Sequence, residues 1–257
     1  MTFADAVARL EQGLRRELPG PRAQDWLAPI PRRQWPTGFN PARIRHAAGL
    51  LLVFPGGVNA ELAESAEKTG YTKEETTSRP HRANDRPEHR DSMLSPRPLR
   101  SISGRPYVVL TVRSDNVRHG GQVSLPGGVV EPGETFEQAA LREAHEEVAL
   151  PLGRVRVIGA LTPLDIPVSG FRLHPIVAVT STPPALTPAD AEVAHILEVG
   201  VDELLDPATL ADTMRERDGI RYQVPGFHLA GREIWGATAM VLAEFLAVLG
   251  WTGRKAT

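Results

Sequence analysis

Residues 128–150, GVVEPGETFEQAALREAHEEVAL, constrain the fold of this chain more than any other segment. Thr135 is followed three residues later by Gln138, the pattern of a capping box at the start of a helix. Residues 136–148 contain no Pro or Gly, so one uninterrupted helix is predicted there. The loop before it, residues 125–134, is rich in Gly and Pro and lets its backbone approach a ligand closely.

Three glutamates of the predicted helix fall on one side of it. Glu143, Glu146 and Glu147 are spaced i, i+3 and i+4, so their like charges repel one another. A divalent cation removes this repulsion, and oxygen-only ligands suit Mg²⁺ or Mn²⁺ better than Zn²⁺. Gly128, in the preceding loop, is a further candidate for the metal site through its backbone. Arg142 faces elsewhere on the helix and is expected to reach round to a carboxylate.

A cluster of glutamates on a helix is more often a solvated face than a metal site. The spacing favours the metal site here, because the chain fits the pattern G-x5-E-x7-R-E-U-x-E-E-x-G-U, where U is aliphatic, at Gly128, Glu134, Arg142 and the three glutamates. One fixed position differs, since Ala149 stands where the pattern has Gly. Gly would ease a left-handed exit from the helix, whereas Ala is expected to be strained there. Pro151 still ends the helix.

This pattern closely resembles the Nudix box, the signature of the Nudix hydrolases. The resemblance implies an α/β fold, the Nudix-like α/β/α sandwich with a mixed sheet between helices. It also implies a diphosphate hydrolase in which the residues matching the three glutamates bind the metal. Arg142 would orient them and Glu134 would support them. The base varies across the family, so it stays open among Glu143, Glu146 and a more distant acid.

Glu192, in ADAEVAHILEV, is the candidate for such a distant acid. It precedes an apolar run, so a surface glutamate at the entry to a strand is an equally good interpretation.

The stretch 108–128, VVLTVRSDNVRHGGQVSLPGG, resembles a second motif, which accompanies the Nudix box in coenzyme A diphosphatases. Coenzyme A carries a 3'-phosphate beside its diphosphate, so its enzyme needs cationic groups away from the metal. Leu125 replaces the aromatic residue of that motif. The resemblance implies four substrate-binding residues, which are Arg113, Ser114, His119 and Gln122.

Two classes of function follow. The first is metal-dependent hydrolysis of coenzyme A or acyl-coenzyme A to 4'-phosphopantetheine and adenosine 3',5'-bisphosphate, with another nucleoside diphosphate linked to X, such as ADP-ribose, as the alternative substrate. The second is a non-catalytic binding protein on the same scaffold. The intact carboxylate cluster counts against the second class, because a mere binder has no need of it.

The composition of the chain is compatible with an enzyme that acts on small molecules. A chain of 257 residues with 41% hydrophobic content can bury one good core. The net charge of -2 shows no excess of positive charge, which binding to nucleic acid or an anionic membrane would favour. Cys is absent, which excludes disulfides and thiolate metal sites. The start of the chain does not resemble a signal peptide, so a cytoplasmic location is expected. A homodimer is left open.

The expected organisation is an N-terminal helix and irregular wrap over residues 1–42, a Nudix domain over 43–250 and a tail over 251–257. Residues 47–54 and 106–112 are predicted as two strands of a hairpin. Between them, residues 55–105 are poor in aliphatic residues and are expected to form a flexible insertion. Further strands follow the box, then one or two short helices within 201–214, and a final helix that starts with Trp235.

Overall fold

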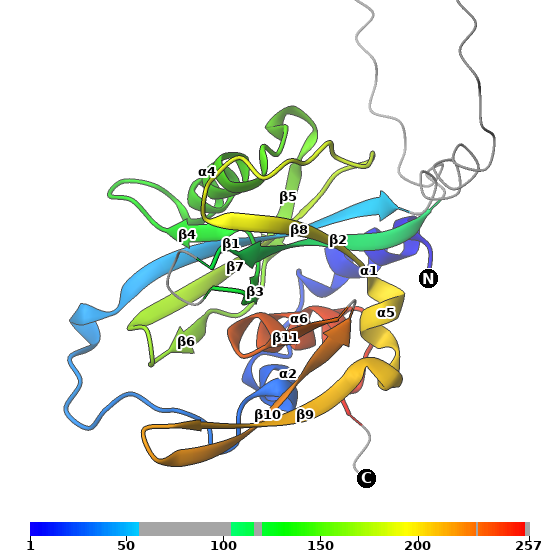
Figure 1. Ribbon diagram of the computed structural model, residues 1–257. Helices are drawn as coiled ribbons and strands as arrows, with labels where there is room; N and C mark the ends of the chain where they lie inside the picture. Colours follow the sequence, from blue (N-terminus) through cyan, green and yellow to red (C-terminus); the bar gives the residue numbers. More distant parts are fainter. Residues whose placement is uncertain (57–103, 116–119, 230, 255–257) are drawn as a thin grey trace, which may run out of the picture.

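The computed structural model describes residues 1–56, 104–115, 120–229 and 231–254. Within these residues, an eight-stranded mixed sheet and a separate three-stranded sheet are present (Figure 1). The flexible insertion predicted for 55–105 lies almost wholly outside the described part of the chain. The division into residues 1–42, 43–250 and 251–257 stays a prediction.

The large sheet has the path β3-β2-β1-β7-β5, with β4, β6 and β8 paired to β1, β7 and β2. Strands β1 and β7 run parallel and the other pairs are antiparallel. The predicted hairpin of 47–54 and 106–112 is confirmed, because β1 and β2 pair antiparallel. The strands are β1 (Arg45–Gly56), β2 (Arg105–Arg113), β3 (Val123–Ser124), β4 (Gly127–Val129), β5 (Arg156–Ala160), β6 (Leu164–Ile166), β7 (Phe171–Val179) and β8 (Val193–Gly200).

Strand β1 is apolar on both faces, and this is why helices cover both sides of the sheet. Leu50, Leu52 and Phe54 belong to a buried cluster with α4 (Phe136–Val148). Leu51 and Val53 alternate with them and pack in the cluster that contains α1 (Phe3–Gly13) and α6 (Ala237–Val248). Figure 1 shows α4 on one face of the large sheet and α1 with α6 on the other. The predicted sandwich of a mixed sheet between helices is therefore confirmed.

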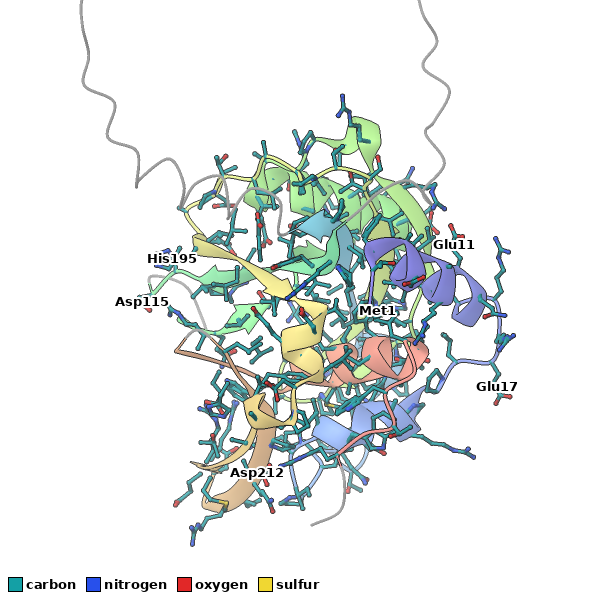
Figure 2. The ribbon with its side chains drawn as sticks, turned by 90° about the vertical axis from the view of Figure 1, so that its right-hand side faces the viewer. Met1, Glu11, Glu17, Asp115, His195 and Asp212 are labelled. Atoms are coloured by element: carbon teal, nitrogen blue, oxygen red, sulfur yellow. The ribbon has the colours of Figure 1, made fainter. Side chains whose placement is uncertain are left out.

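The small antiparallel sheet consists of β9 (Leu210–Arg217), β10 (Ile220–Leu229) and β11 (Arg232–Trp235). It lies below α6 in Figure 1, and Figure 2 shows Asp212 on it, away from Asp115 and His195 at the edge of the large sheet. Because α6 has the large sheet above it and the small sheet below, its residues from Thr238 to Leu246 are all buried.

A buried carboxylate ties the N-terminal segment to this second layer. Glu244 of α6 is fully buried and accepts hydrogen bonds from the Gly20 N–H (3.2 Å) and Gln24 Nε2 (2.9 Å). It also accepts from the N–H (3.2 Å) and the hydroxyl (2.6 Å) of Thr162. Its hydrogen bonds thus offset the cost of burying the group. The segment held there contains α2 (Pro21–Gln24) and η1 (Asp25–Leu27).

One local prediction is confirmed and another is wrong. The one or two short helices expected within 201–214 are α5 (Val201–Leu205) and η5 (Pro207–Thr209), after which the chain enters β9. Trp235, however, ends β11 instead of starting the last helix. The sequence analysis missed the small sheet, in which the turn between β9 and β10 at Asp218 and Gly219 has two positive φ angles (55° and 74°). The remaining short elements are η2 (Pro41–Arg43) and η4 (Leu152–Arg154).

No helix in the described part of the chain is long and apolar enough to cross a membrane.

Ala149 ends α4 in the left-handed conformation, with φ 54° and ψ 32°, as expected from its place in the sequence pattern. A non-glycine residue is disfavoured there by about 1–2 kcal/mol, and Gly loses about 0.5–1 kcal/mol in extra unfolded-state entropy. Ala149→Gly is therefore expected to raise the free energy of unfolding by about 0.5–1 kcal/mol, measured by urea denaturation. The matched control is Ala8→Gly, at an exposed position inside α1, which should lower it by about 1 kcal/mol. Equal effects of the two substitutions would contradict the strain at Ala149.

Candidate functional site

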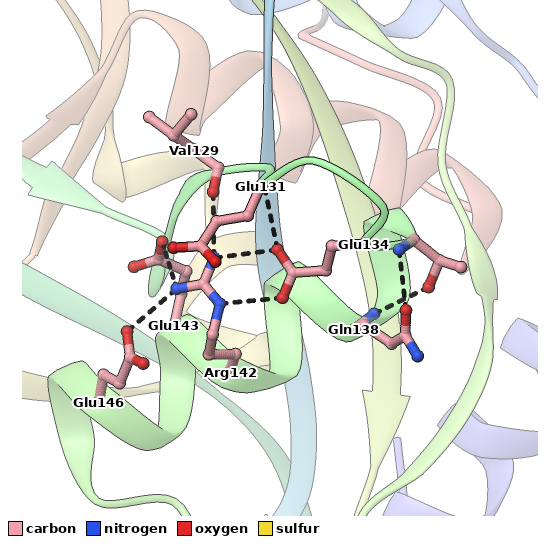
Figure 3. A network of polar contacts seen from close by, with 8 residues as sticks. Val129, Glu131, Glu134, Gln138, Arg142, Glu143 and Glu146 are labelled. Carbon is pink, nitrogen blue, oxygen red and sulfur yellow. Dashed lines mark hydrogen bonds and ion pairs between the residues drawn. The ribbon is translucent and has the colours of Figure 1, made fainter.

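The helix that carries the three glutamates starts where the sequence predicts. The Thr135 hydroxyl oxygen accepts the Gln138 N–H at 3.1 Å, and the Gln138 side-chain oxygen accepts the Thr135 N–H at 2.9 Å. This reciprocal capping fixes the first turn of α4. Ala140, Ala144 and Val148 then face the large sheet and are buried. The buried stripe sets the rotation of the helix and directs residues 142, 143 and 146 toward the preceding loop (Figure 3).

Arg142 connects that loop to the carboxylates of the helix (Figure 3). Its Nε and Nη2 donate to the two carboxylate oxygens of Glu134 at 2.9 and 3.1 Å, and Nη2 also donates to the Val129 carbonyl at 3.1 Å. Its Nη1 donates to Glu143 at 2.9 Å and to Glu146 at 3.0 Å. These hydrogen bonds lower the pKa of Glu134 and raise that of Arg142, so both stay charged. Arg142 thus reaches a carboxylate, as the sequence predicts.

Glu143 and Glu147 form the inner part of the site, against the glycines of β4. A Cβ atom added to Gly128 would lie 2.4 Å from a carboxylate oxygen of Glu143, so that oxygen occupies space only Gly leaves open. Glu147 is 6% exposed and accepts the Gly127 N–H at 3.1 Å. Burial raises the pKa of Glu143, and it raises the pKa of Glu147 to about 7, with the Glu143 charge adding to the effect.

Two residues predicted from distant parts of the sequence meet at this site. Arg113, at the end of β2, donates from Nη2 to the Glu192 carboxylate at 2.8 Å, and the Ser114 N–H donates to the Glu192 carbonyl at 2.7 Å. The charges of Arg113 and Glu192 both act on the pKa of Glu147, the first lowering and the second raising it. Glu192 is therefore not an isolated surface residue, although its role as a base stays a prediction.

Two predicted substrate-binding residues remain, Gln122 and His119, and the structure describes only the first. Gln122 lines the same cavity as Arg113, Gly127 and Gly128. His119 lies outside the described residues.

That cavity, of about 560 Å³, extends from the glycines of β4 to the small sheet. Sequence reasoning missed the residues that the small sheet contributes, because it did not predict the sheet. The available signal was the Asp218-Gly219 pair between two strand-like runs. The missed lining residues are Arg215, Arg217, Tyr222 and Trp235 from β9–β11, with Arg32 and Arg33 from the N-terminal segment.

Among the residues that the structure describes, no three acidic or His side chains are grouped as a ready ligand set, because Glu146 is turned toward Arg142. The donor chemistry nevertheless fits Mg²⁺ or Mn²⁺. Glu143 and Glu147 present oxygen ligands one turn apart, burial disfavours the charged form of both, and the charge of Glu143 further raises the pKa of Glu147. A divalent cation relieves that cost, so the residues fit one.

Comparison with known proteins gives one consistent family. The model of the NUDIX domain matches residues 99–218. The chain is 37% identical over 141 residues to the uncharacterized Nudix hydrolase NudL of Pectobacterium atrosepticum, covering 54% of this chain and 73% of that protein. It is also 37% identical over 139 residues to NudL of Yersinia pestis, covering 53% and 69%.

Solved structures similar to this chain have the same fold family in their descriptions. The Nudix hydrolase RenU of M. smegmatis aligns with a TM-score of 0.46 at 20% identity, covering 82% of this chain and 90% of that one. The NUDIX domain of Shewanella oneidensis NrtR, in complex with ADP ribose, aligns with a TM-score of 0.36 at 14% identity, covering 67% and 82%.

Gly128→Ala is expected to weaken the binding of Mn²⁺ by about ten-fold or more, because the added methyl group displaces the Glu143 carboxylate and misplacement by about 1 Å is costly at such sites. Titration calorimetry of the full chain measures the affinity. Gly153→Ala is the matched control, since its Cβ meets nothing within 4 Å and it should bind Mn²⁺ like the wild type. Unchanged affinity of Gly128→Ala would mean that the Glu143 carboxylate lies outside the metal site.

The raised pKa of Glu147 predicts a dependence of stability on pH in protein stripped of metal. The folded state holds the proton up to about pH 7, whereas the unfolded carboxyl releases it near 4.5. Folding therefore binds a proton in this window, and the contribution of Glu147 to stability is lost as pH rises from about 4.5 to about 7. Glu147→Gln should flatten this part of the curve of unfolding free energy against pH, measured with a chelator present. A slope that the substitution leaves unchanged would show that Glu147 ionises normally.

Proposed function

Because this chain belongs to the Nudix hydrolase family, we propose that it is a metal-dependent enzyme that hydrolyses the diphosphate of coenzyme A or acyl-coenzyme A to 4'-phosphopantetheine and adenosine 3',5'-bisphosphate. Nudix hydrolases generally use Mg²⁺ or Mn²⁺. The observation that carries the proposal is the meeting of two motifs. Arg113 and Gln122, from the motif resembling that of coenzyme A diphosphatases, line one cavity with Gly127 and Gly128, against which the carboxylates lie.

Glu143, Glu146 and Glu147 would hold the metal ion, with the backbone at Gly128 beside them. When bound, such an ion neutralises charge on the diphosphate oxygens and lowers the pKa of water. Arg142 keeps the carboxylates in position, since it binds Glu143 and Glu146 with one nitrogen and is itself anchored on Glu134.

In the reaction, a water oxygen forms a bond to one phosphorus atom of the diphosphate and the bridging P–O bond breaks. The water gives one proton to a carboxylate, and the two phosphate products separate. Glu192 is the proposed acceptor, because its charge acts on Glu147, and in the structure its carboxylate pairs with Arg113. When a substrate phosphate takes the place of Glu192 as the partner of Arg113, the Glu192 carboxylate becomes available for the proton.

Purified protein incubated with Mg²⁺ or Mn²⁺ is expected to hydrolyse coenzyme A in preference to ADP-ribose or a dinucleotide polyphosphate. The physical reason is that the site is expected to bind the 3'-phosphate of coenzyme A, which ADP-ribose lacks. Chromatography of the products measures the preference and identifies the broken bond. A higher kcat/KM for a substrate without the 3'-phosphate would overturn the assignment of coenzyme A.

Variants connect this activity to the site. Glu146→Gln and Glu147→Gln should abolish metal-dependent turnover, and Glu192→Gln should lower kcat by about 10²–10⁴-fold if it is the base. Glu137→Gln, exposed in the first turn of the same helix, is the matched control and should retain full activity. Circular dichroism checks that each variant is folded. Full activity of Glu147→Gln would place the metal elsewhere.

A homodimer and a cytoplasmic location stay predictions.

A further inference from the structure

The cavity between the large and the small sheet, called here the inter-sheet cavity, has the size of a ligand site. Its volume of about 560 Å³ falls within the range of about 300–1,000 Å³ that is usual for small-molecule pockets. One end is formed by Gly127 and Gly128, next to the carboxylates, and the other by β9 and β10. A substrate whose diphosphate lies at the carboxylates can therefore extend one of its two arms into this space.

The walls of the inter-sheet cavity are mainly apolar. Aliphatic side chains reach it from the turn before β4, from the segment around β6, and from the layer formed by β10 and α6. Among them are Leu125, Leu164, Ile166, Val168, Val224 and Met240. Such walls stabilise an aliphatic group by removing it from water, and they stabilise a phosphate much less.

The guanidinium groups around the far end of the cavity already take part in ion pairs. Each arginine there has a carboxylate partner within the described residues: Arg32 has Asp25, Arg33 and Arg217 share Asp218 at 3.6 and 3.7 Å, and Arg215 has Glu233. Two further carboxylates line the cavity, which are Asp165, itself paired with Arg172, and Glu216. A phosphate dianion placed there would have to displace existing partners and lie close to these carboxylates. An uncharged arm meets neither cost.

Two aromatic rings hold arginine side chains flat against the small sheet. The guanidinium of Arg215 lies 4.1 Å from the ring centre of Trp235, and that of Arg33 lies 4.7 Å from the ring centre of Tyr222. Arg215 Nε and Glu233 Oε1 are buried and have no hydrogen-bond partner among the described residues. This pair therefore keeps one donor and one acceptor unused, and the Arg215 donor belongs to a side chain that lines the cavity.

We propose that the inter-sheet cavity binds the uncharged, amide-containing arm of the substrate, which is pantetheine with any acyl group attached, and that the adenosine 3',5'-bisphosphate half lies outside it. This assignment rests on the proposed function, because it takes coenzyme A as the substrate. It makes the small sheet a wall that selects substrates by the length of the acyl chain.

The test narrows the cavity and measures the two halves of the substrate separately. Ile166→Trp adds an indole to the half-buried β6 wall, and Val168→Trp does the same at the exposed rim, where folding is at less risk. Met214→Trp is the matched control, since Met214 is 55% exposed and does not line the cavity. Titration calorimetry with Mg²⁺ present measures the affinity of each full-length variant for 4'-phosphopantetheine and for adenosine 3',5'-bisphosphate.

Ile166→Trp and Val168→Trp should weaken 4'-phosphopantetheine binding by about ten-fold or more, as expected when a close-fitting apolar pocket loses space. Both should leave the bisphosphate affinity as in the control, and kcat/KM should fall most for the longest acyl-coenzyme A. Weaker bisphosphate binding instead would assign the cavity to the nucleotide half, and no change in either affinity would remove it from the site. If the wild type binds 4'-phosphopantetheine through this cavity but leaves coenzyme A intact, the proposed function falls and the cavity assignment stands.

Discussion

The guanidinium of Arg142 is the interaction on which the rest of the site depends. Glu134, Glu143 and Glu146 would repel one another if no positive charge lay among them, and Glu134 of the loop would lose its bond to the helix. Arg142 offers its donors in a rigid planar fork, so one side chain binds two carboxylate oxygens of the loop and one from each of two helix residues. A lysine is a single point of charge and could not make this set.

Strand β1 is buried on both faces, and this burial connects α4 and the loop before it to the rest of the fold. Its even-numbered side chains from Leu50 to Phe54 anchor α4, and β4 pairs with the start of the same strand, at Ala47 to Gly49. The odd-numbered side chains hold the layer of α1 and α6, and α6 in turn supports the small sheet. The carboxylates and the far wall of the inter-sheet cavity therefore stand in a fixed relation, although they belong to opposite faces of the large sheet.

The features that the sequence predicted correctly depend on interactions between residues that are close together in the chain. The capping box at Thr135, the reach of Arg142 and the left-handed Ala149 each depend on residues within about one or two turns of the helix, and the structure shows all three. The small sheet was missed because the apolar residues after Pro207 are compatible with either a helix or a strand. Pairing with a second strand selects the strand conformation, as the pairing of Tyr222 with Arg215 across the turn shows. Similarly, only the folded chain shows that Glu192 meets Arg113.

The burial of the two inner carboxylates costs free energy of folding. Glu147 is buried, accepts a hydrogen bond from the Gly127 N–H and faces the neighbouring charge of Glu143, so its ionised form is disfavoured near neutral pH. A core built for stability alone would replace such a pair with apolar side chains. The chain instead holds two desolvated carboxylates beside glycines that leave room for them. Under the proposed function, a cation bound there would offset the free energy that the burial of these groups costs.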